Sequence, residues 1–348
     1  RVLLDEMHNG EVPIEVAVTE APHRTMAAGL EYKTDEGPGT HFHWEHRNMR
    51  RLGHTLTLDS TLATELREIE VGYRVEPFRR QVQALTLSSE IAQEERDAYD
   101  SDHVLGLAMV EREVTDPMTV GLGVGLRLSR VEQRGRETTH QLLYVPLELG
   151  LDYANDELNP TSGFRFRAEV APYVDVFGED SRFFKADAEL SHYLGFGTLD
   201  TGDEDTLEAW VLATRLHVGS LLGESLLDVP PDLRYYAGGG GSIRGYPYQT
   251  VSPLEEDDPI GGRSVATASI ELRKRINETL GFVVFVDGGT AFEASWPDFG
   301  NDLHYGAGAG VRYFTPLGPL RFDVAVPLDK REALDDPYEI YLSIGQAF

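Results

Sequence analysis

The sequence contains no cysteine among its 348 residues, which excludes disulfide bonds and thiolate metal sites. It also lacks a long apolar run, since its most apolar stretch, residues 281–286, is far shorter than the roughly 20 residues that a membrane helix needs. Positive charge is scarce, with 31 Lys and Arg against 59 Asp and Glu. The formal net charge of −28 argues against nucleic-acid binding, which requires clustered cations.

Period-two alternation of apolar and polar residues dominates the chain, whereas no long segment has the spacing of an amphipathic helix. The cleanest run is Thr119–Leu128, in which Val and Leu alternate with Thr, Gly and Arg. Clusters of Gly, Pro, Asn and Asp separate such runs. We therefore predict an all-β fold, with strands near residues 25–34, 39–47, 53–64, 66–75, 81–95, 98–113, 118–132, 138–153, 163–177, 181–196, 206–219, 264–275, 280–288, 304–314, 319–326 and 338–348.

The length and the facing of these strands favour a membrane barrel over a soluble sandwich. Many of them exceed about ten residues, enough to cross a bilayer at a tilt, whereas sandwich strands run to about five or six. The polar face is often charged, as at Glu271 and Arg273, which suits a wet lumen, and Tyr and Phe gather near strand ends. We predict a closed antiparallel transmembrane β-barrel of about 16 strands over residues 24–348.

One long segment, residues 234–264, does not alternate and is the richest in Gly and Pro. Its middle, Ile243-Arg244-Gly245-Tyr246, places one cation and one aromatic ring among glycines. Loops of this length are usually functional or disordered. We predict that this loop, over residues 220–263, folds back into the barrel lumen and that Arg244 holds it there.

Two of these motifs resemble those of a known family. Residues 237–246, with Ile243-Arg244-Gly245-Tyr246 at their end, resemble the signature of the sixth loop in the outer-membrane assembly factors, which include BamA, TamA and the two-partner secretion transporters. The run 285–289, Phe-Val-Asp-Gly-Gly, resembles the matching motif on the thirteenth strand of that superfamily. Within it, residues 29–38, 318–327 and 344–348 are most similar to TamA, the barrel subunit of the translocation and assembly module.

The resemblance implies a non-enzymatic insertase in the outer membrane of a Gram-negative bacterium. Such a protein helps to fold and insert, or to translocate, β-barrel clients such as autotransporters, and it needs no cofactor. The implied partners are outer-membrane lipid and lipopolysaccharide, unfolded outer-membrane client proteins, and a TamB-like partner anchored in the inner membrane; nucleic acid is not among them. Residues 1–23 would be the C-terminal remnant of a periplasmic POTRA domain.

Alternation along residues 281–288 turns Phe285 and Asp287 towards the lumen and the intervening residues towards lipid. A guanidinium in a lumen with restricted water needs a planar acceptor, which a carboxylate provides bidentately. The resemblance implies that Arg244 pairs with Asp287 and that Phe285 packs against the loop motif. It also assigns Gly289 to the same strand motif.

A lateral gate is the second expected site, because a barrel must close by pairing its first strand with its last. Both predicted strands contain glycine, which weakens strand pairing. In the superfamily this seam is short and opens sideways, so that a client strand can add to the exposed edge. A fully paired seam is the alternative. The residues expected at the gate are Gly29, Leu30, Leu342, Gly345 and Phe348.

Other functions have weaker support in the sequence. The alternative to an insertase is a passive pore or a two-partner secretion channel. An enzyme is not predicted, because no spacing of Ser, His and Asp indicates a catalytic triad. His41, His43 and Glu45 share a strand face but lack a fourth ligand, so no metal site is predicted. The acidic run 255–258 is interpreted as a solvated loop rather than a calcium site.

Overall fold

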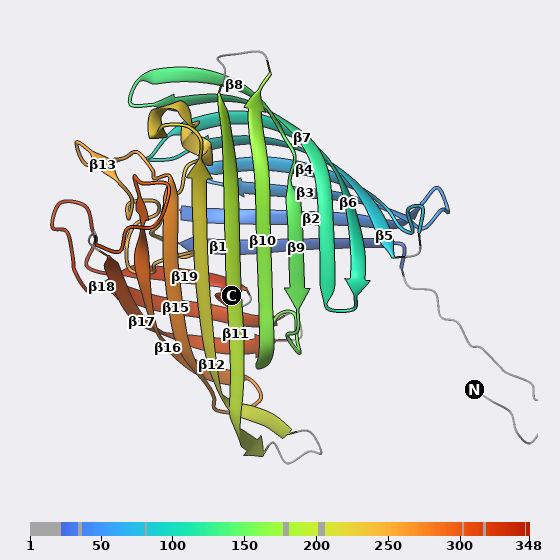
Figure 1. The fold of residues 1–348 in the computed structure, drawn as a ribbon. Helices are drawn as coiled ribbons and strands as arrows, with labels where there is room; N and C mark the ends of the chain where they lie inside the picture. The colour runs from blue at the N-terminus through green and yellow to red at the C-terminus, as the bar shows by residue number, and fades with distance from the viewer. Residues whose placement is uncertain are drawn as a thin grey trace, which may run out of the picture.

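The computed structural model describes residues 22–33, 37–80, 82–176, 181–200, 206–300, 303–315, 318–344 and 346–348. Within these residues seventeen strands form one sheet of antiparallel pairs, which closes into a barrel because β1 pairs with both β2 and β19 (Figure 1). No helix of the described part is long and apolar enough to cross a membrane. Apart from Pro22 and His23, the predicted domain remnant over residues 1–23 lies outside the described residues.

The barrel strands follow one another around the wall in chain order. Their bounds are β1 (Arg24–Lys33), β2 (Gly37–Met49), β3 (His54–Ala63), β4 (Leu66–Val75), β5 (Gln83–Glu95), β6 (Asp100–Thr115), β7 (Met118–Gln133), β8 (Arg136–Tyr144), β9 (Leu147–Asp152), β10 (Ser162–Asp175), β11 (Arg182–Asp200), β12 (Thr206–Leu222), β15 (Ser264–Arg275), β16 (Leu280–Phe292), β17 (His304–Thr315), β18 (Gly318–Pro327) and β19 (Glu339–Ile344). The connection between β12 and β15 holds four short elements, η2 (Leu226–Asp228), η3 (Pro231–Leu233), β13 (Leu254–Glu255) and β14 (Asp258–Pro259).

The strand predicted over residues 138–153 is interrupted in the structure. β8 ends at Tyr144 and β9 begins at Leu147, and both segments lie between β7 and β10. Pro146 lies in the gap, where its missing N–H cannot contribute to a ladder. Its carbonyl still accepts a hydrogen bond of 2.9 Å from the N–H of Gly123. The two segments therefore occupy one position in the wall.

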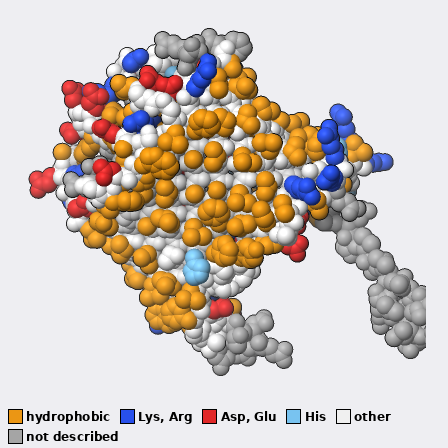
Figure 2. Space-filling view, viewed as in Figure 1, with side chains coloured by type: hydrophobic (Ala, Val, Ile, Leu, Met, Phe, Trp, Pro, Cys, Tyr) orange, Lys and Arg blue, Asp and Glu red, His pale blue; other side chains and the backbone are white. Residues whose placement is uncertain are grey.

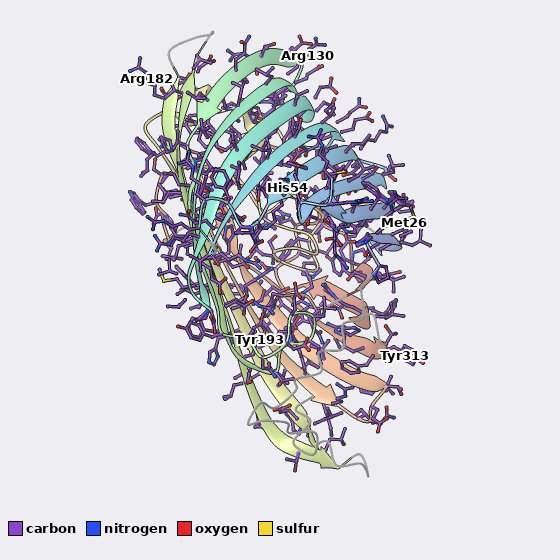
Figure 3. The ribbon with its side chains drawn as sticks, turned by 90° about the vertical axis from the view of Figure 1, so that its right-hand side faces the viewer. Met26, His54, Arg130, Arg182, Tyr193 and Tyr313 are labelled. Carbon is purple, nitrogen blue, oxygen red and sulfur yellow. The ribbon has the colours of Figure 1, made fainter. Side chains whose placement is uncertain are left out.

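Side chains alternate between an apolar outer belt and the lumen, as the sequence pattern predicts. On β16, Phe282, Val284 and Val286 are 47%, 54% and 48% exposed, whereas Phe285 and Asp287 are buried. Figure 2 shows the resulting belt of hydrophobic side chains on the outside of the barrel. In Figure 3, Met26 of β1 and Tyr313 of β17 lie at the outer edge of the molecule, and both are more than half exposed. The outer belt is what a hydrocarbon surrounding requires.

The C-terminal strand is shorter than predicted, and the last residue does not continue it. β19 ends at Ile344. The Phe348 ring lies 5.2 Å from the guanidinium carbon of Arg215 and 5.3 Å from that of Arg273. Arg273 also donates a hydrogen bond of 3.2 Å to the Phe348 carbonyl. Because these two cations face the lumen, the end of the chain turns inward and Phe348 does not share the outer face of β19.

Candidate functional site

The connection between β12 and β15, residues 223–263, packs inside the barrel wall. Its side chains of Ile243, Tyr246 and Val251 are fully buried. They belong to one apolar cluster with wall residues such as Leu142 of β8 and Phe183 of β11. The connection is therefore anchored by burial of apolar surface as well as by the polar contacts described next. We call residues 223–263 the lumenal loop.

The tip of the lumenal loop lies so close to the wall that side chains are excluded at two positions. Gly245 has a φ of +99°, which disfavours any other residue, and a Cβ there would lie 2.7 Å from the carbonyl carbon of Val326. On β17, a Cβ at Gly306 would lie 1.9 Å from the carbonyl oxygen of Arg244. These glycines allow the loop backbone to rest directly on β17 and β18.

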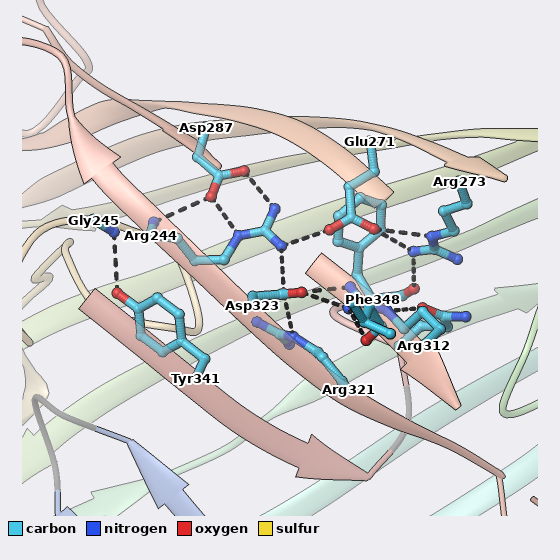
Figure 4. A network of polar contacts seen from close by, with 12 residues as sticks. Arg244, Gly245, Glu271, Arg273, Asp287, Arg312, Arg321, Asp323, Tyr341 and Phe348 are labelled. Atoms are coloured by element: carbon cyan, nitrogen blue, oxygen red, sulfur yellow. Dashed lines mark hydrogen bonds and ion pairs between the residues drawn. The ribbon is translucent and has the colours of Figure 1, made fainter. Parts of the chain in front are cut away.

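Arg244 is buried at the tip of the lumenal loop and binds Asp287 of β16 through three donors (Figure 4). Its Nε and Nη2 donate to the two carboxylate oxygens at 2.6 and 2.8 Å, and its backbone N–H donates at 3.1 Å. The guanidinium carbon also lies 3.4 Å from the centre of the Phe285 ring. This bidentate pair with a stacked aromatic ring is a strong, geometrically specific arrangement.

Two further carboxylates complete the surroundings of Arg244. Its Nη1 donates to Glu271 of β15 at 2.6 Å and to Asp323 of β18 at 3.3 Å. Asp323 also accepts hydrogen bonds from Arg312 of β17 and from Arg321 of its own strand. The loop tip is thus tied to four consecutive strands, β15 to β18.

The environment of Arg244 keeps its guanidinium charged. Burial by itself lowers the pKa of Arg244, but the attraction of Glu271 and the hydrogen bonds and charge of Asp287 outweigh it, so the pKa rises above its usual value. A buried charge is costly unless it is paired and hydrogen-bonded. The three carboxylates meet that requirement, so the cluster holds the loop tightly in one position.

A second set of contacts links the loop tip to the last strand. The backbone N–H of Gly245 donates a hydrogen bond of 3.0 Å to the hydroxyl of Tyr341 on β19. The Tyr246 hydroxyl donates to the carbonyl of Tyr305 at 3.1 Å and also bonds the Asp329 carboxylate. The lumenal loop therefore contacts every strand from β15 to β19.

The structure brings the predicted loop and strand motifs together. The loop residues 243–246 meet Phe285 and Asp287, while Gly289, with a φ of +146°, leaves no room for a Cβ, which would lie 2.1 Å from the carbonyl oxygen of Ala266. The sequence reasoning missed four partners of this cluster: Glu271, Arg312, Asp323 and Tyr341. Alternation placed Glu271 on a polar face, but it contains no signal for which loop that side chain would meet.

Three of the five expected gate residues, Gly29, Leu30 and Leu342, lie on the two strands that close the barrel. Leu30 is 77% exposed and Leu342 is 43% exposed on the outer surface, and Gly29 lies beside Leu30 on β1. Phe348 turns into the lumen, as described above, and Gly345 lies outside the described residues. Between β1 and β19 the described register contains Tyr32 opposite Leu342 and Lys33 opposite Tyr341.

The weaker candidate sites have ordinary local partners. His41 bonds the Thr61 hydroxyl at 3.1 Å, and His43 bonds Asp59 at 2.6 Å. Among the described residues, no group of three or more His, Asp or Glu is arranged to hold a metal ion. The acidic run 255–258 lies within the hairpin β13–β14 and forms ion pairs with Arg134, at the turn after β7.

A closed membrane barrel with a long loop held in its lumen by a buried arginine defines the class of this protein. Residues 48–348 match the Omp85 superfamily domain, and the chain belongs to that superfamily. It is an outer-membrane β-barrel protein of the Gram-negative type.

Sequence relatives include two bacterial assembly factors and a plastid protein. The chain is 30% identical over 206 residues to the outer membrane protein assembly factor BamA of Nitratidesulfovibrio vulgaris, covering 57% of this chain and 24% of the relative. It is 27% identical over 155 residues to BamA of Neisseria meningitidis, covering 35% and 19%. It is 30% identical over 175 residues to outer envelope protein 39 of Arabidopsis thaliana chloroplasts, covering 43% and 45%. The matches thus span less than half of each relative.

Solved structures share the fold. BamA from Haemophilus ducreyi lacking POTRA domains 1–3 superposes with a TM-score of 0.75 at 19% identity, covering 92% of this chain and 70% of the other. CdiB from Acinetobacter baumannii gives a TM-score of 0.64 at 14% identity, covering 92% and 59%. At these identities the likeness establishes the barrel architecture.

Proposed function

We propose that this barrel folds and inserts other β-barrel proteins into the outer membrane by opening sideways between β1 and β19. The observation that carries the proposal is the uneven pairing of β1. Along β2 it is paired from Arg24 to Lys33, whereas along β19 the described register contains only the pairs at Tyr32 and Lys33. Most of β1 therefore presents an edge that a client strand can pair with.

Such a gate can open without an external energy source. Opening the seam breaks the hydrogen bonds between β1 and β19, and a client strand that pairs with β1 replaces them. The lumenal loop binds β15 to β19 and so keeps the part of the wall that ends at the seam in register while the seam is open. Membership of a superfamily that contains the BamA assembly factors supports this role.

Within the superfamily, we place the chain nearest to TamA. The similarity of residues 29–38 and 318–327 to TamA supports autotransporters as clients and a TamB-like protein as the partner in the inner membrane. The same proposal includes residues 1–23 as the end of a periplasmic POTRA domain and lipopolysaccharide as a lipid that the barrel contacts. The alternative is a secretion channel, which would show a large and steady conductance in planar bilayers. Residues 223–263 occupy the lumen, and this argues against such a conductance.

Locking the seam tests the proposal, and the absence of native cysteine makes the experiment clean. Tyr32 and Leu342 face each other across the seam, so cysteines at these positions can form a disulfide. We expect the oxidised Tyr32→Cys/Leu342→Cys barrel in proteoliposomes to lose assembly of an unfolded client barrel, and reduction to restore it. The client is followed by its heat-modifiable electrophoretic mobility.

A matched control places the same disulfide where no opening is proposed. Ala27 and His43 are opposite residues on β1 and β2, which are paired along their length. The oxidised Ala27→Cys/His43→Cys barrel should assemble clients at the normal rate. Client assembly at full rate by the Tyr32–Leu342 cross-linked barrel would rule out lateral opening.

A further inference from the structure

Four arginines lie at the tips of two neighbouring turns of the barrel. Arg50 and Arg51 lie between β2 and β3, and Arg79 and Arg80 lie between β4 and β5. All four are exposed, and their guanidinium groups form no ion pair with any described residue. We call Arg50, Arg51, Arg79 and Arg80 the arginine rim.

The backbone of these turns does not explain the choice of arginine. Arg50, Arg51 and Arg79 have φ values of +55°, +60° and +57°, in the left-handed region that favours glycine and asparagine. Natural turns with this geometry usually carry those residues. The Arg79 guanidinium carbon lies 5.4 Å from the centre of the Phe78 ring in its own turn, but the disfavoured conformations of all three arginines indicate that their side chains also serve a purpose outside the turn.

The arginine rim is positively charged, whereas other described turns at the same end of the barrel carry acidic residues. The described turns at the same end carry Asp116 between β6 and β7, Asp156 and Glu157 between β9 and β10, and Glu278 between β15 and β16. In a chain with a net charge of −28, unpaired positive charge is thus concentrated beneath β2 to β5. Such a local reversal of sign favours an anionic partner at this place.

The rim directly continues the lipid-facing belt. Leu52 and Val82, in the same two turns, are 61% and 44% exposed. Figure 2 shows Lys and Arg side chains gathered at one edge of the hydrophobic surface, at the end where the chain enters the barrel. Cations beside apolar side chains at the edge of a belt match the boundary between acyl chains and phosphate groups. This continuity favours a lipid over a soluble acidic partner.

We propose that the arginine rim binds the headgroups of anionic phospholipids in the leaflet at this end of the barrel. Each guanidinium can bind phosphate oxygens bidentately, and four of them on adjacent turns form a multivalent site. Because β2 directly follows β1, the bound lipids lie beside the part of β1 that is not paired with β19 in the described register. The inference rests on the charges and exposure of the turns and does not require the assembly function.

The test measures which phospholipids the purified barrel retains. The barrel in non-ionic detergent is mixed with phosphatidylglycerol or phosphatidylcholine of the same acyl chains at low salt, and bound lipids are counted by native mass spectrometry. We expect the wild type to retain phosphatidylglycerol in preference. Changing Arg50, Arg51, Arg79 and Arg80 to Gln should weaken that retention about tenfold or more. High salt should weaken it in the wild type as well.

The control removes the same charge from the opposite end of the barrel. Arg67, Arg130, Arg136 and Arg182 are exposed there, and Figure 3 shows Arg130 and Arg182 together at that end. Changing these four to Gln should leave the lipid preference unchanged. Heat-modifiable mobility verifies folding of each variant. If the full variant does not fold, the half-rim variants Arg50→Gln/Arg51→Gln and Arg79→Gln/Arg80→Gln replace it, and each should lose part of the preference.

Two outcomes would overturn the proposal. One is equal retention of phosphatidylglycerol by the wild type and by the rim variants. The other is a wild type with no lipid preference that binds a polyglutamate peptide through the rim, which would make the site one for acidic polypeptides.

Discussion

Replacing Asp287 with asparagine probes how strongly the buried cluster holds the lumenal loop. The substitution preserves the shape of the side chain, but the amide nitrogen cannot accept a hydrogen bond, and Arg244 loses its bidentate counter-ion. Asp287 accepts three hydrogen bonds from Arg244 in the wild type. Breaking a buried ion pair by removing one partner costs about 3–5 kcal/mol. Glu271 and Asp323 still neutralise Arg244, so we expect the lower end, about 3 kcal/mol.

That free energy corresponds to an increase of about 100-fold in the population of the displaced loop. Limited trypsin digestion of the folded barrel can report it, because the cleavage site after Arg244 is only 2% exposed in the docked loop. When opening is fast relative to cutting, the cleavage rate follows the open population. We therefore expect Asp287→Asn to be cut after Arg244 about 100 times faster than the wild type.

Asp152→Asn provides the comparison, because it makes the same chemical change outside the loop. Asp152 pairs with Arg165 at 3.1 Å, but its carboxylate is 57% exposed, and exposed pairs contribute about 0–1 kcal/mol. Its cleavage after Arg244 should match the wild type. If Asp287→Asn were cut no faster than Asp152→Asn, the buried cluster would not be what holds the loop.

Two other predictions concern the same loop tip. Gly306→Ala places a Cβ 1.9 Å from the carbonyl oxygen of Arg244, and since β17 is paired on both sides we expect a loss of about 1–3 kcal/mol, measured as a lower urea midpoint. Burial, followed by the hydrogen bond to Asp329, raises the pKa of Tyr246 above its usual 10.0. The neutral hydroxyl therefore contributes its full stability below pH 10 and loses it as the pH rises through the raised pKa. The difference in phenolate absorbance between the wild type and Tyr246→Phe reports ionisation of Tyr246, and it should appear only above pH 10.

The barrel wall was predictable because alternation is a local consequence of having lipid on one side and a polar lumen on the other. The runs around Val120–Leu128 and 281–288 encode their facing without reference to any partner. The break at Pro146 was also visible in principle, since proline cannot donate to a ladder. The loop motif and Asp287 could be matched only through the family resemblance.

The remaining partners depend on distances that a single sequence does not contain. Glu271, Arg312 and Asp323 come from three different strands. Glu271 and Asp323 bind Arg244, Arg312 binds Asp323, and this cluster is set by strand register and by the path of the loop. The inward turn of Phe348 likewise depends on cations supplied by β12 and β15. The sequence pattern predicts a strand that continues to residue 348, and alternation along it would put Phe348 on the same face as Leu342 rather than in the lumen.

The hydrogen bond between Gly245 and Tyr341 connects the lumenal loop to the seam strand β19, and removing it should loosen both. In Tyr341→Phe the backbone N–H of Gly245 stays buried but loses the hydroxyl that accepts its hydrogen bond of 3.0 Å in the wild type. An unsatisfied buried donor costs about 1–3 kcal/mol, which corresponds to roughly 5- to 150-fold faster exchange of the amides that open with it. Hydrogen–deuterium exchange should therefore speed up both around Gly245 and along residues 339–344.

Tyr313→Phe is the matched control for that exchange experiment. Tyr313 is 53% exposed on the outer face of β17, so loss of its hydroxyl leaves no buried donor unpaired. Its exchange rates should equal those of the wild type at both places. If Tyr341→Phe accelerated exchange around Gly245 but left residues 339–344 unchanged, the loop would be docked independently of β19. In that case the loop could steady the wall only as far as β18, and the strand at the seam would owe its position to its pairing with β18 and β1.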